Sequence, residues 1–377
     1  MKMVLHDNGN WIRFAPLTLT RPIGELRMGI FTNSERWKFL VDTAEIYYST
    51  EHYLSKKFLS CSTPDVTINA CLIPSRKLME AILELAQDDC LMLDNHWLAK
   101  KGTGTNVVQW TEECLLIDQR WHLFQFNEQA IFQDFELVSH HRTSQLISAN
   151  NTIIGDPSLI FSESGAKVEA SVLNTTNGPI YIGKNAEIME GSLVRGPLAM
   201  LPDSALKLGT KVYGATTLGP HCKVGGEVNN VIFQGYSNKG HDGFLGNALI
   251  GEWCNLGADT NASNLKNNYG SISTYSYETK SEVETNTQFM GLCMSDHSKC
   301  GINTMFNTAT VVGVSSNVFG AEFPPKFIPS FSWGGTSLVT FNFEKAIEYS
   351  NNMMQRRGLK LSDEDVEILR YIADTTK

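Results

Sequence analysis

The sequence predicts a parallel β-helix that follows a mixed α/β segment. From about Ile180 to Val314 the chain repeats six-residue units, each opened by an aliphatic residue that is often followed by glycine. Clear examples are Ile182–Glu187, Leu218–Lys223 and Ile250–Asn255. A short fixed period of this kind is typical of a solenoid. Three hexads complete one triangular coil, with the aliphatic side chains inside and glycine or small residues at the corners.

The α/β segment is expected to span residues 1–145. Short buried strands are predicted at Met3–Leu5 and Ala44–Ser49, and Leu78–Gln87 has the spacing of a helix with one apolar side. Leu91–Leu98 is predicted to form a β-hairpin with Asp-Asn at its turn. Strands alternating with helical segments favour a separate α/β domain.

The repeats are expected to fill a second domain over residues 146–320. Two interruptions are predicted, at 226–245 and at 262–290, where the hexad pattern lapses. Insertions in a solenoid leave the coils as loops on one side and often carry the functional site. The first interruption is therefore the place to look for catalytic residues.

Residues 321–377 are predicted to be a helical cap. The first helix covers Phe341–Arg357, and the second opens at Ser362, with Asp365 at the spacing of a capping box. An open solenoid end exposes unpaired strand edges. We therefore expect the two helices to cover that end of the coils.

Composition and charge exclude several classes of partner. The net charge of −9 leaves no basic stripe for nucleic acid. No run of about 20 apolar residues is present to cross a bilayer, and the first residues lack the apolar core of a signal peptide. The eight cysteines form no CxxC pair, so we expect reduced thiols and no zinc site. These features together predict a cytoplasmic protein.

A motif that resembles an acyltransferase site lies within the first interruption. It comprises Lys239–Gly251, then Asn255–Thr260 and Asn264. The run resembles the acetyltransferase domain of the bifunctional N-acetylglucosamine-1-phosphate uridyltransferase / glucosamine-1-phosphate acetyltransferase family. That family reads K-x-G-H-x-x-Y-L-G-D-x-x-I-G, followed by N-I-G-A-G-T and C-N-Y. The likeness is greatest to a variant found in Bacteroidetes-type bacteria, and it implies a left-handed parallel β-helix.

The resemblance also implies the roles of individual residues. His241 would be the general base that takes a proton as a sugar amine attacks the thioester, a task that suits an imidazole near neutral pH. Asn255 and Asn264 would bind the sugar or its phosphate, and Lys239 would offset phosphate charge. Ala258 would line the slot for acetyl-CoA. Family sites lie between neighbouring subunits, so a homotrimer is implied.

The sequence departs from the family at several positions. Phe244 stands where the family has tyrosine, and Asp259 replaces a glycine. The family arginine that holds the sugar phosphate has no clear equivalent, although Tyr213 falls near its position and Arg195 is the nearest arginine upstream. These changes affect the choice of sugar more than the type of reaction. Two further histidines among the repeats, at positions 221 and 297, are assigned structural roles.

A second motif lies near the N-terminus, over Arg13–Gly29, after the polar turn Asp7–Asn10. It resembles the opening of the sugar-1-phosphate nucleotidyltransferases, G-x-G-T-R-L-x-P-L-T-x-x-x-P-K-x-L-x-x-x-G, and so implies a short Rossmann-like domain. In that family the loop wraps the phosphates of a nucleoside triphosphate with its amides. Mg²⁺ bridges the phosphates and orients the attacking sugar phosphate.

The residues of this second motif match the family in part. Arg13 keeps the arginine position and is the expected catalytic residue, whereas the glycines before it are mostly lost and Ile23 occupies the lysine position. Arg21 and Arg27 would supply the missing charge toward the substrate. No set of metal carboxylates can be assigned from the sequence, and Asp7 is the nearest candidate.

The leading hypothesis is a transferase of UDP-N-acetylglucosamine biosynthesis for the cell envelope. The β-helix would acetylate a hexosamine 1-phosphate, and the N-terminal domain would join the product to a nucleotide from UTP. One alternative is nucleotidyl transfer alone, as in glucose-1-phosphate nucleotidyltransferases, with the β-helix as an oligomerisation or allosteric domain. Another is a protein that binds sugar nucleotides without catalysis. Fold alone does not decide among them.

Overall fold

The chain divides into two compact units in this computed structural model, which describes residues 1–375. The first unit comprises Met1–Arg27 and Phe31–His122, and the second comprises Met28–Ile30 and everything from Leu123 onward. The sequence places its first boundary at residue 145, whereas the contacts divide the chain before the helix that leads into the coils. Each unit has its own core.

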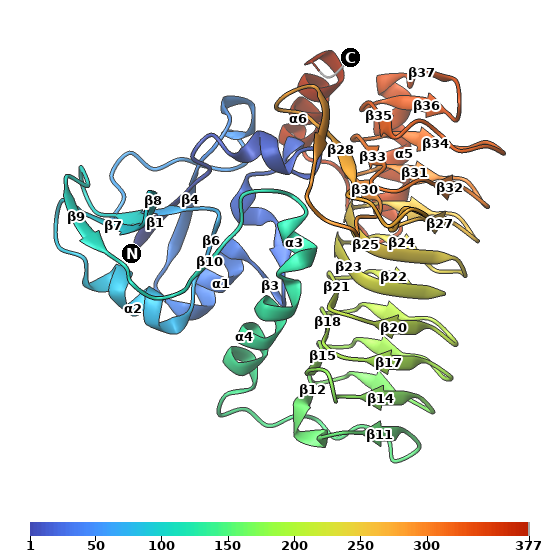
Figure 1. Cartoon of the computed structure of the whole chain (residues 1–377), viewed down its shortest axis with the longest axis horizontal. Helices are drawn as coiled ribbons and strands as arrows, with labels where there is room; N and C mark the ends of the chain where they lie inside the picture. The colour runs from blue at the N-terminus through green and yellow to red at the C-terminus, as the bar shows by residue number, and fades with distance from the viewer. Residues whose placement is uncertain (376–377) are drawn as a thin grey trace. The chain divides into compact units, whose positions relative to one another are not determined.

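A six-stranded mixed sheet forms the first unit, in the order β4-β1-β5-β8-β7-β9 (Figure 1). β1 runs parallel to both of its neighbours, as in a Rossmann-like sheet. The strands are β1 Lys2–His6, β4 Glu45–Ser49, β5 Val66–Asn69, β7 Asp89–Leu93, β8 His96–Lys100 and β9 Asn106–Gln109. The short strands are β2 Arg27–Met28, β3 Phe31–Thr32, β6 Leu72–Ile73 and β10 Leu115–Leu116, and the helices are α1 Asn33–Leu40 and α2 Arg76–Glu84.

The predicted strands, helix and hairpin of this unit are present, with α2 at Arg76–Glu84 where the sequence predicts Leu78–Gln87. Asp94 turns the β7–β8 hairpin with φ of 50°, the left-handed conformation that aspartate tolerates better than most residues. α2 begins after Ser75, whose hydroxyl accepts a hydrogen bond from the backbone N–H of Leu78. β1 is buried as predicted, while β4 is only half-buried.

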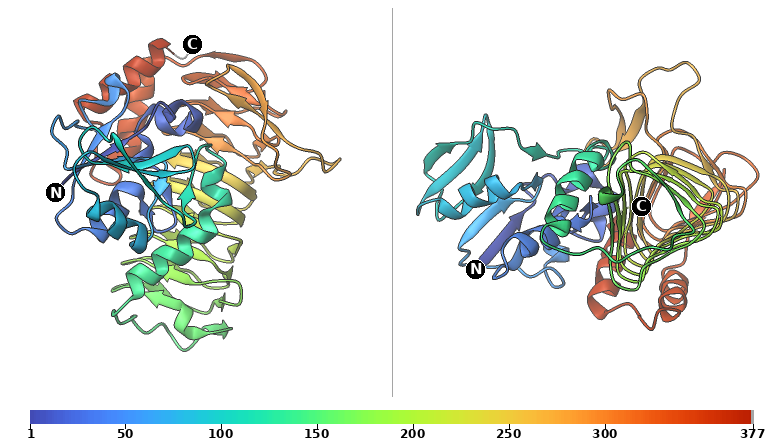
Figure 2. Two further views of the ribbon diagram at one scale, coloured as in Figure 1. Left: turned by 60° about the vertical axis from the view of Figure 1, so that its left-hand side comes forward. Right: turned by 90° about the horizontal axis from the view of Figure 1, so that it is seen from below.

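The second unit is a parallel β-helix, which confirms the predicted fold, and its coils have a triangular outline when viewed along the axis (Figure 2). The first face holds β11 Thr152–Ile154, β14 Val172–Asn174, β17 Leu193–Arg195, β20 Lys211–Tyr213, β23 Glu227–Gly235, β25 Phe244–Glu252, β27 Asn261–Ala262 and β32 Met305–Phe306. The second face holds β12 Ile160–Ser162, β15 Ile180–Ile182, β18 Leu198–Met200, β21 Thr216–Leu218, β30 Cys293–Met294, β33 Val311–Val312 and β35 Phe327–Ile328. The long strands β23 and β25 turn from the first face onto the second, where they lie between β21 and β30. The third face holds β13 Lys167–Val168, β16 Glu187–Ile188, β19 Ala205–Leu206, β22 Lys223–Val224, β24 Asn238–Lys239, β26 Asn255–Leu256, β31 Lys299–Cys300, β34 Asn317–Val318 and β36 Ser332–Gly334.

Aliphatic ladders fill the interior of the coils. On the first face Val194, Val212, Val228 and Leu245 stack at successive levels, each almost fully buried. Each fully buried aliphatic side chain contributes about 1.5–3 kcal/mol to folding. The hexad aliphatics therefore point inward as the sequence predicts, and their sum is the main source of stability.

At one corner of the coils the left-handed backbone position is occupied by residues other than glycine. Where the second face meets the third, His221, Tyr236 and Trp253 each have φ between 54° and 58°. Their rings stack, with centroids 4.9 Å and 4.3 Å apart. Contacts between the rings offset part of the cost of the left-handed backbone. His221 therefore takes part in a corner stack.

The two predicted interruptions differ in kind. Residues 226–245 are not an insertion, because β23, β24 and β25 continue all three ladders through them. Residues 263–289 do leave the coil and form the hairpin of β28 Ser273–Ser276 and β29 Ser281–Glu284. The shortened, glycine-rich corner at 225–226 breaks the spacing of the hexads and had the appearance of an insertion.

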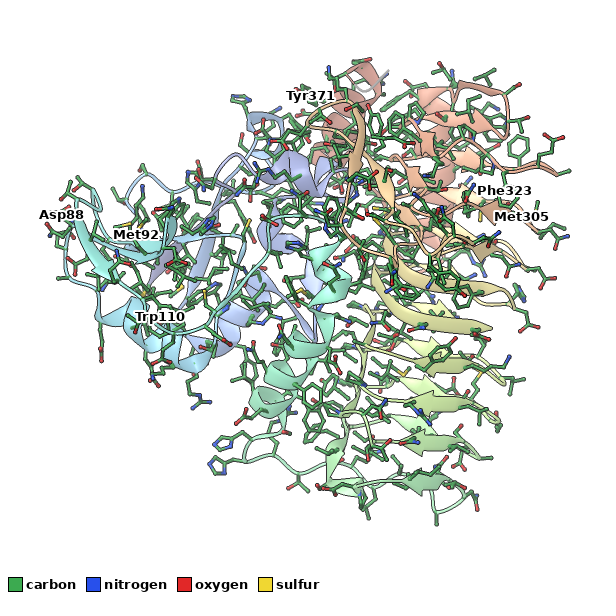
Figure 3. The ribbon with its side chains drawn as sticks, in the orientation of Figure 1. Asp88, Met92, Trp110, Met305, Phe323 and Tyr371 are labelled. Carbon is green, nitrogen blue, oxygen red and sulfur yellow. The ribbon has the colours of Figure 1, made fainter. Side chains whose placement is uncertain are left out.

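The coils also continue beyond Gly320, where the sequence places the end of the repeats. β35 and β36 extend the ladders, and β37 Leu338–Thr340 then pairs antiparallel with β36. Met305 of β32 and Phe323 in the loop before β35 project from these last coils (Figure 3), and both are exposed. The loop over 319–326 bulges from a corner without ending the solenoid.

Two helices lie between the sheet unit and the coils in sequence, α3 His122–Gln125 and α4 Asn127–Ser139. The side-chain amide of Asn127 donates to the Ala215 carbonyl and to Thr217 Oγ1, both at 3.1 Å, and its oxygen accepts from the N–H of Gly29 at 2.7 Å. The carboxylate of Asp134 accepts from the N–H of Ile30 at 2.8 Å. These buried bonds hold α4 and the short segment 28–30 on the second face of the coils.

The two predicted C-terminal helices are present as α5 Phe343–Gln355 and α6 Asp363–Thr375. Ser362 and Asp365 form the expected capping box, with both side chain-to-backbone bonds at 3.1 Å. In the view along the axis the helices lie beside the triangular outline of the coils (Figure 2). Among residues 1–375, no helix is long and apolar enough to cross a membrane.

Candidate functional site

His241 lies at a four-residue corner of the coils. β24 ends at Lys239 and β25 begins at Phe244, so the four residues Gly240–Gly243 turn the corner between the third and first faces. The same corner one coil earlier needs only residues 225–226. Four residues are usual at this corner, as at 207–210 and 257–260, so the corner at 225–226 is the short one. His241 is exposed above it.

The backbone of this corner requires glycine at its end. Gly243 has φ of +109°, and a Cβ at this position would approach the Thr260 carbonyl oxygen to 2.2 Å. No side chain can be accommodated there without displacing the next coil. Among residues 1–375, the His241 imidazole has no hydrogen-bonding partner, so only its backbone fixes its position.

The sequence predicted that Lys239 contacts a sugar phosphate. In the structure its side chain points into the coil instead. It pairs with Val224, which in turn pairs with Leu206, so it occupies an inward-facing position of an otherwise aliphatic ladder. Its side chain is 1% exposed. The ammonium donates to the carbonyls of Gly225, His241 and Asp242 at 3.0, 2.8 and 3.1 Å. All three donors are therefore used by backbone beneath the His241 corner.

Burial lowers the pKa of Lys239 to about 8, against the opposing effects of Asp242, Asp259 and Cys300. In the unfolded chain the ordinary value is 10.5. Between pH 8 and 10.5 the unfolded chain holds a proton that the folded chain lacks, so the folded state gains stability as pH rises. We expect wild type to gain about 3 kcal/mol over Lys239→Met across this range.

Denaturant unfolding at pH 7.5 and at pH 10.5 measures this change. The control is Lys184→Met, at an exposed corner, which should differ from wild type by the same amount at both pH values. A free-energy difference between wild type and Lys239→Met that does not change with pH would mean that Lys239 titrates like an exposed lysine.

The next coil brings Ala258, a predicted site residue, and its neighbour Asp259 to the same corner. The backbone N–H of Asp259 donates to the Asp242 carbonyl at 3.0 Å, so the two corners stack directly. Ala258 precedes Asp259, is half-buried, and accepts from the N–H of Asn303 at 2.8 Å. The structure thus places Ala258 one coil above His241.

The two predicted asparagines occupy different places. Asn255, on β26, accepts a hydrogen bond from the amide of Asn238 at 3.1 Å on the outside of the third face. Asn264 follows β27 and donates to Asn247 Oδ1 at 2.8 Å, at the far end of that strand from the His241 corner. Only Asn255 lies on a strand that leads directly into the corner containing Ala258.

A hollow of about 520 Å³ lies on the outside of the first face, on earlier coils. Arg195 and Tyr213, the two candidates for the missing phosphate ligand, both line it, together with Lys211 and the exposed Leu193. The Tyr213 hydroxyl donates to Glu227 at 2.6 Å. Burial, together with this carboxylate, raises the pKa of Tyr213 to about 12. Glu227 also lines the hollow and pairs with Lys211 at 3.8 Å, so Arg195 supplies the remaining positive charge.

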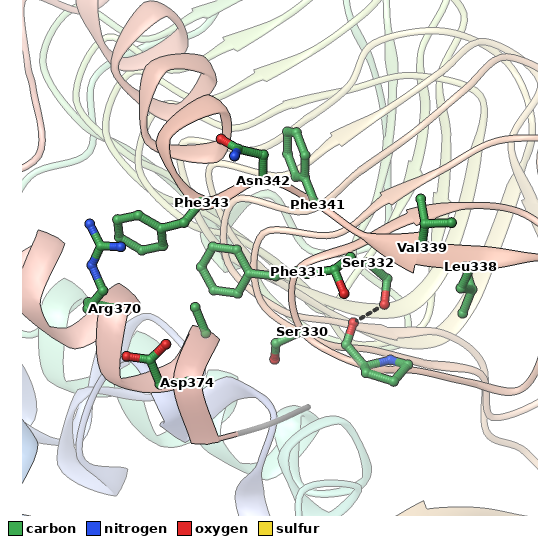
Figure 4. Close-up of a pocket in the computed structure, with 13 residues that line it drawn as sticks. Ser330, Phe331, Ser332, Leu338, Val339, Phe341, Asn342, Phe343, Arg370 and Asp374 are labelled. Atoms are coloured by element: carbon green, nitrogen blue, oxygen red, sulfur yellow. Dashed lines mark hydrogen bonds between the residues drawn. The ribbon is translucent and has the colours of Figure 1, made fainter.

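A second hollow, of about 530 Å³, lies between the last coil and α6 (Figure 4). The rings of Phe331, Phe341 and Phe343 line one side of it. Arg370 stacks over the Phe343 ring at 3.6 Å and is paired with Glu344 at 2.8 Å. The cation is thus already neutralised, and none of the predicted site residues reaches this hollow.

In the first unit, polar groups gather where the parallel strands end. Asp7 follows β1, Thr50 follows β4 and Asn69 ends β5. The Asp7 carboxyl accepts from Thr50 Oγ1 at 2.6 Å and from the N–H of Ile23 at 3.1 Å. Burial raises the pKa of Asp7 to about 7. In an open α/β sheet ligands bind at this edge, at the point where the strand order reverses.

Arg13 belongs to the same edge. It is half-buried in the turn that follows β1. Burial raises the pKa of the neighbouring Cys71 thiol to about 12; Asp7 adds to this effect and Arg13 opposes it. Asn10 donates to the Cys71 sulfur at 3.8 Å. Arg13 and Asp7 therefore both affect the electrostatics of the Cys71 thiol.

The other two predicted arginines are buried. Arg27 makes a two-point ion pair with Glu35, at 2.8 and 3.1 Å. Glu35 also accepts from the N–H of Thr32 and so completes the capping box of α1. Arg27 is therefore part of the support for this helix. Arg21 is 8% exposed.

A Mg²⁺ ion at the carboxyl edge of the sheet would need carboxylate ligands. Among residues 1–375, no group of three or more His, Cys, Asp or Glu side chains could hold a metal ion. Both oxygens of Asp7 already accept hydrogen bonds, and its raised pKa disfavours the charged form that a hard cation requires. The described residues thus do not form a resident magnesium site.

Comparison with known families bears on the first unit. Residues 3–143 match the family model described as "Sugar nucleotidyl transferase". This match supports the assignment of the chain as a transferase. No curated protein matches the chain.

Solved structures resemble the chain only weakly. The UDP-N-acetylglucosamine acyltransferase of Arabidopsis is 13% identical, with 59% of this chain and 77% of that chain covered and a TM-score of 0.27. The polysialic acid O-acetyltransferase OatWY is 15% identical, with 53% and 90% covered and a TM-score of 0.27. A UDP-N-acetylglucosamine acyltransferase from Campylobacter jejuni is 14% identical, with 62% and 97% covered and a TM-score of 0.19. TM-scores this low support no functional inference.

Some residues of these two sites were missed by the sequence reasoning. Asn247, which holds Asn264, had no signal beyond its place in the motif. The bond from Ile23 to Asp7 could not be foreseen, because a backbone donor is independent of residue type. The inward position of Lys239 did have a signal, since it occupies a place that Val224 fills one coil earlier.

Proposed function

We propose that the β-helix acetylates the amine of a hexosamine 1-phosphate, with acetyl-CoA as donor and glucosamine 1-phosphate as the first candidate acceptor. The observation that carries the proposal is the position of His241. It is exposed at a four-residue corner whose Asp242 carbonyl accepts from the Asp259 N–H of the next coil, where Ala258 lies. A base in this position is accessible from solvent and has unoccupied ring nitrogens.

In the proposed reaction the amine nitrogen attacks the thioester carbonyl carbon while the His241 imidazole takes a proton from nitrogen. The tetrahedral intermediate then expels the CoA sulfur, and the imidazolium returns the proton to that thiolate. An N–C bond forms and a C–S bond breaks, so the products are the amide and free CoA. Backbone amides near Ala258 would stabilise the oxyanion.

We further propose that the first unit transfers a nucleotide from UTP to the acetylated sugar phosphate and releases pyrophosphate. The family match over residues 3–143 and the position of Arg13 in the turn after β1, the strand that Asp7 follows, support this second activity. Arg13 would stabilise the charge of the transferred phosphoryl group. UDP-N-acetylglucosamine would be the final product.

Two assays test the proposals separately. Free thiol is measured with acetyl-CoA and glucosamine 1-phosphate, and pyrophosphate is measured with UTP and N-acetylglucosamine 1-phosphate. Thiol release that depends on the acceptor supports acetyl transfer. If pyrophosphate alone is released, the alternative of nucleotidyl transfer with a non-catalytic β-helix holds. If neither assay responds across several sugar phosphates, a binding protein is the better description.

The proposal includes a cytoplasmic homotrimer in which a second chain completes the site at His241. The hollow around Arg195, with the exposed Leu193 and Tyr213, offers a surface that such a neighbour could cover. Sedimentation equilibrium should give three times the chain mass of 41.9 kDa. If the protein is a monomer at micromolar concentration, no second chain can complete the site, and this part of the proposal is wrong.

A further inference from the structure

We propose that Lys239 is a positioning residue: its buried ammonium holds the backbone of the 240–243 corner and thereby sets the place of His241. This inference rests on the proposed acetyl transfer. Residues 188, 206 and 224 on the same ladder are Ile, Leu and Val, all almost fully buried. A charge in such a ladder is costly unless its donors are all satisfied.

The contacts of the ammonium explain why a lysine stands there. The corner at 225–226 beneath is two residues shorter, and the carbonyl groups of 240–243 that turn inward over it need donors in a region without water. Lys239 supplies donors to the carbonyls of His241 and Asp242, while a third bond to Gly225 connects the corner to the coil beneath. The Asp242 carbonyl also accepts from the next coil through the Asp259 N–H. The corner is therefore held from inside and from above.

Glycines leave room for the ammonium. A Cβ added to Gly226, with its φ of +75°, would lie 2.9 Å from Lys239 Nζ and 2.7 Å from the Gly243 carbonyl oxygen. A Cβ on Gly225 would meet the Gly240 carbonyl oxygen at 2.8 Å. The floor of the corner is thus free of side chains, and the ammonium fills the space beneath the loop.

The arrangement matters because the His241 ring has no hydrogen-bonding partner in the described chain. A catalytic base is normally oriented by a third group. Here the ring depends on its own backbone, and a shift of about 1 Å in that backbone can lower a rate by about 10²-fold. Lys239 would act on catalysis through His241 and would not touch the substrate.

The test compares wild type with Lys239→Met and Lys239→Gln. Lys299→Met is the matched control, because Lys299 also has a pKa lowered to about 8 by burial and donates to a carbonyl, that of His297, at 2.9 Å. Hydrogen exchange of the peptide that contains residues 240–243 is measured first. We expect exchange to speed by about 10-fold or more in Lys239→Met and to remain unchanged in the control.

Steady-state kinetics supply the second readout. In Lys239→Met we expect kcat for acetyl transfer to fall by about 10²-fold with little change in KM for acetyl-CoA. Lys239→Gln, whose amide can still donate, should fall less and gives the answer if the methionine variant does not fold. Exchange that stays slow in both variants, or a kcat that stays within about two-fold of wild type, overturns the inference. An inactive wild type contradicts only the proposed acetyl transfer, since the exchange experiment does not need it.

Discussion

His241→Ala should lower kcat for acetyl transfer by about 10²–10⁴-fold, the usual contribution of a general base. The imidazole is exposed at the corner, and its removal leaves the coil ladders intact. The measurement is thiol release from acetyl-CoA with glucosamine 1-phosphate. Far-ultraviolet circular dichroism and the thermal transition should stay unchanged, which would exclude unfolding as the cause.

His221→Ala is the matched control. His221 also sits at a coil corner and is partly exposed, but it stacks on Tyr236 at another corner of the triangle. It should keep full acetyl transfer and lose at most the ring contact, about 0.5–1.5 kcal/mol of stability. Equal activity losses in the two variants would contradict a specific role for His241.

Arg13→Ala should lower the rate of pyrophosphate release by about 10²–10³-fold, because one preorganised cation is lost from the developing phosphoryl charge. Arg13 lies at the carboxyl edge of the sheet, close enough to Cys71 to affect the thiol pKa. Arg76→Ala provides the control from the same unit, at the exposed first position of α2. Pyrophosphate release from UTP with N-acetylglucosamine 1-phosphate is the assay.

The two variants also test each other. Because His241 and Arg13 belong to separate compact units, each substitution should affect one activity and spare the other. Thiol release should survive in Arg13→Ala, and pyrophosphate release should survive in His241→Ala. A loss of both activities in either variant would indicate damage to the whole chain and would contradict two independent sites.

The fold of the coils was predictable because its signal repeats. Every hexad places an aliphatic residue inside, and the ladder of Val194, Val212, Val228 and Leu245 is one outcome of that rule. The end of the repeats was less predictable. The loop over 319–326 lacks the pattern, yet β35 and β36 resume the ladders by pairing with the strands before them. Pairing with an existing edge can replace local sequence preference.

The site was predictable only as far as residue type determines geometry. His241 was identified from its motif, and the structure places it at an exposed corner. The motif did not indicate which way the side chain of Lys239 points. Its register with the inward-facing Val224 shows that it points into the coil. The ion pair of Arg27 could not be predicted from its residue type. Its partner Glu35 lies eight residues away, and the pair forms only because Glu35 is held in the capping box of α1.

The hairpin of β28 and β29 interrupts a single coil without disturbing the ladders around it. Ile232 pairs with Leu249 one coil earlier, whereas Leu249 must reach Cys293, more than twice as far along the chain. Loop-closure entropy grows only logarithmically, at about 0.6 kcal/mol for each doubling of length. The longer coil thus costs less than one buried valine contributes, so a chain of this kind can acquire new loops at a corner without losing its folded state.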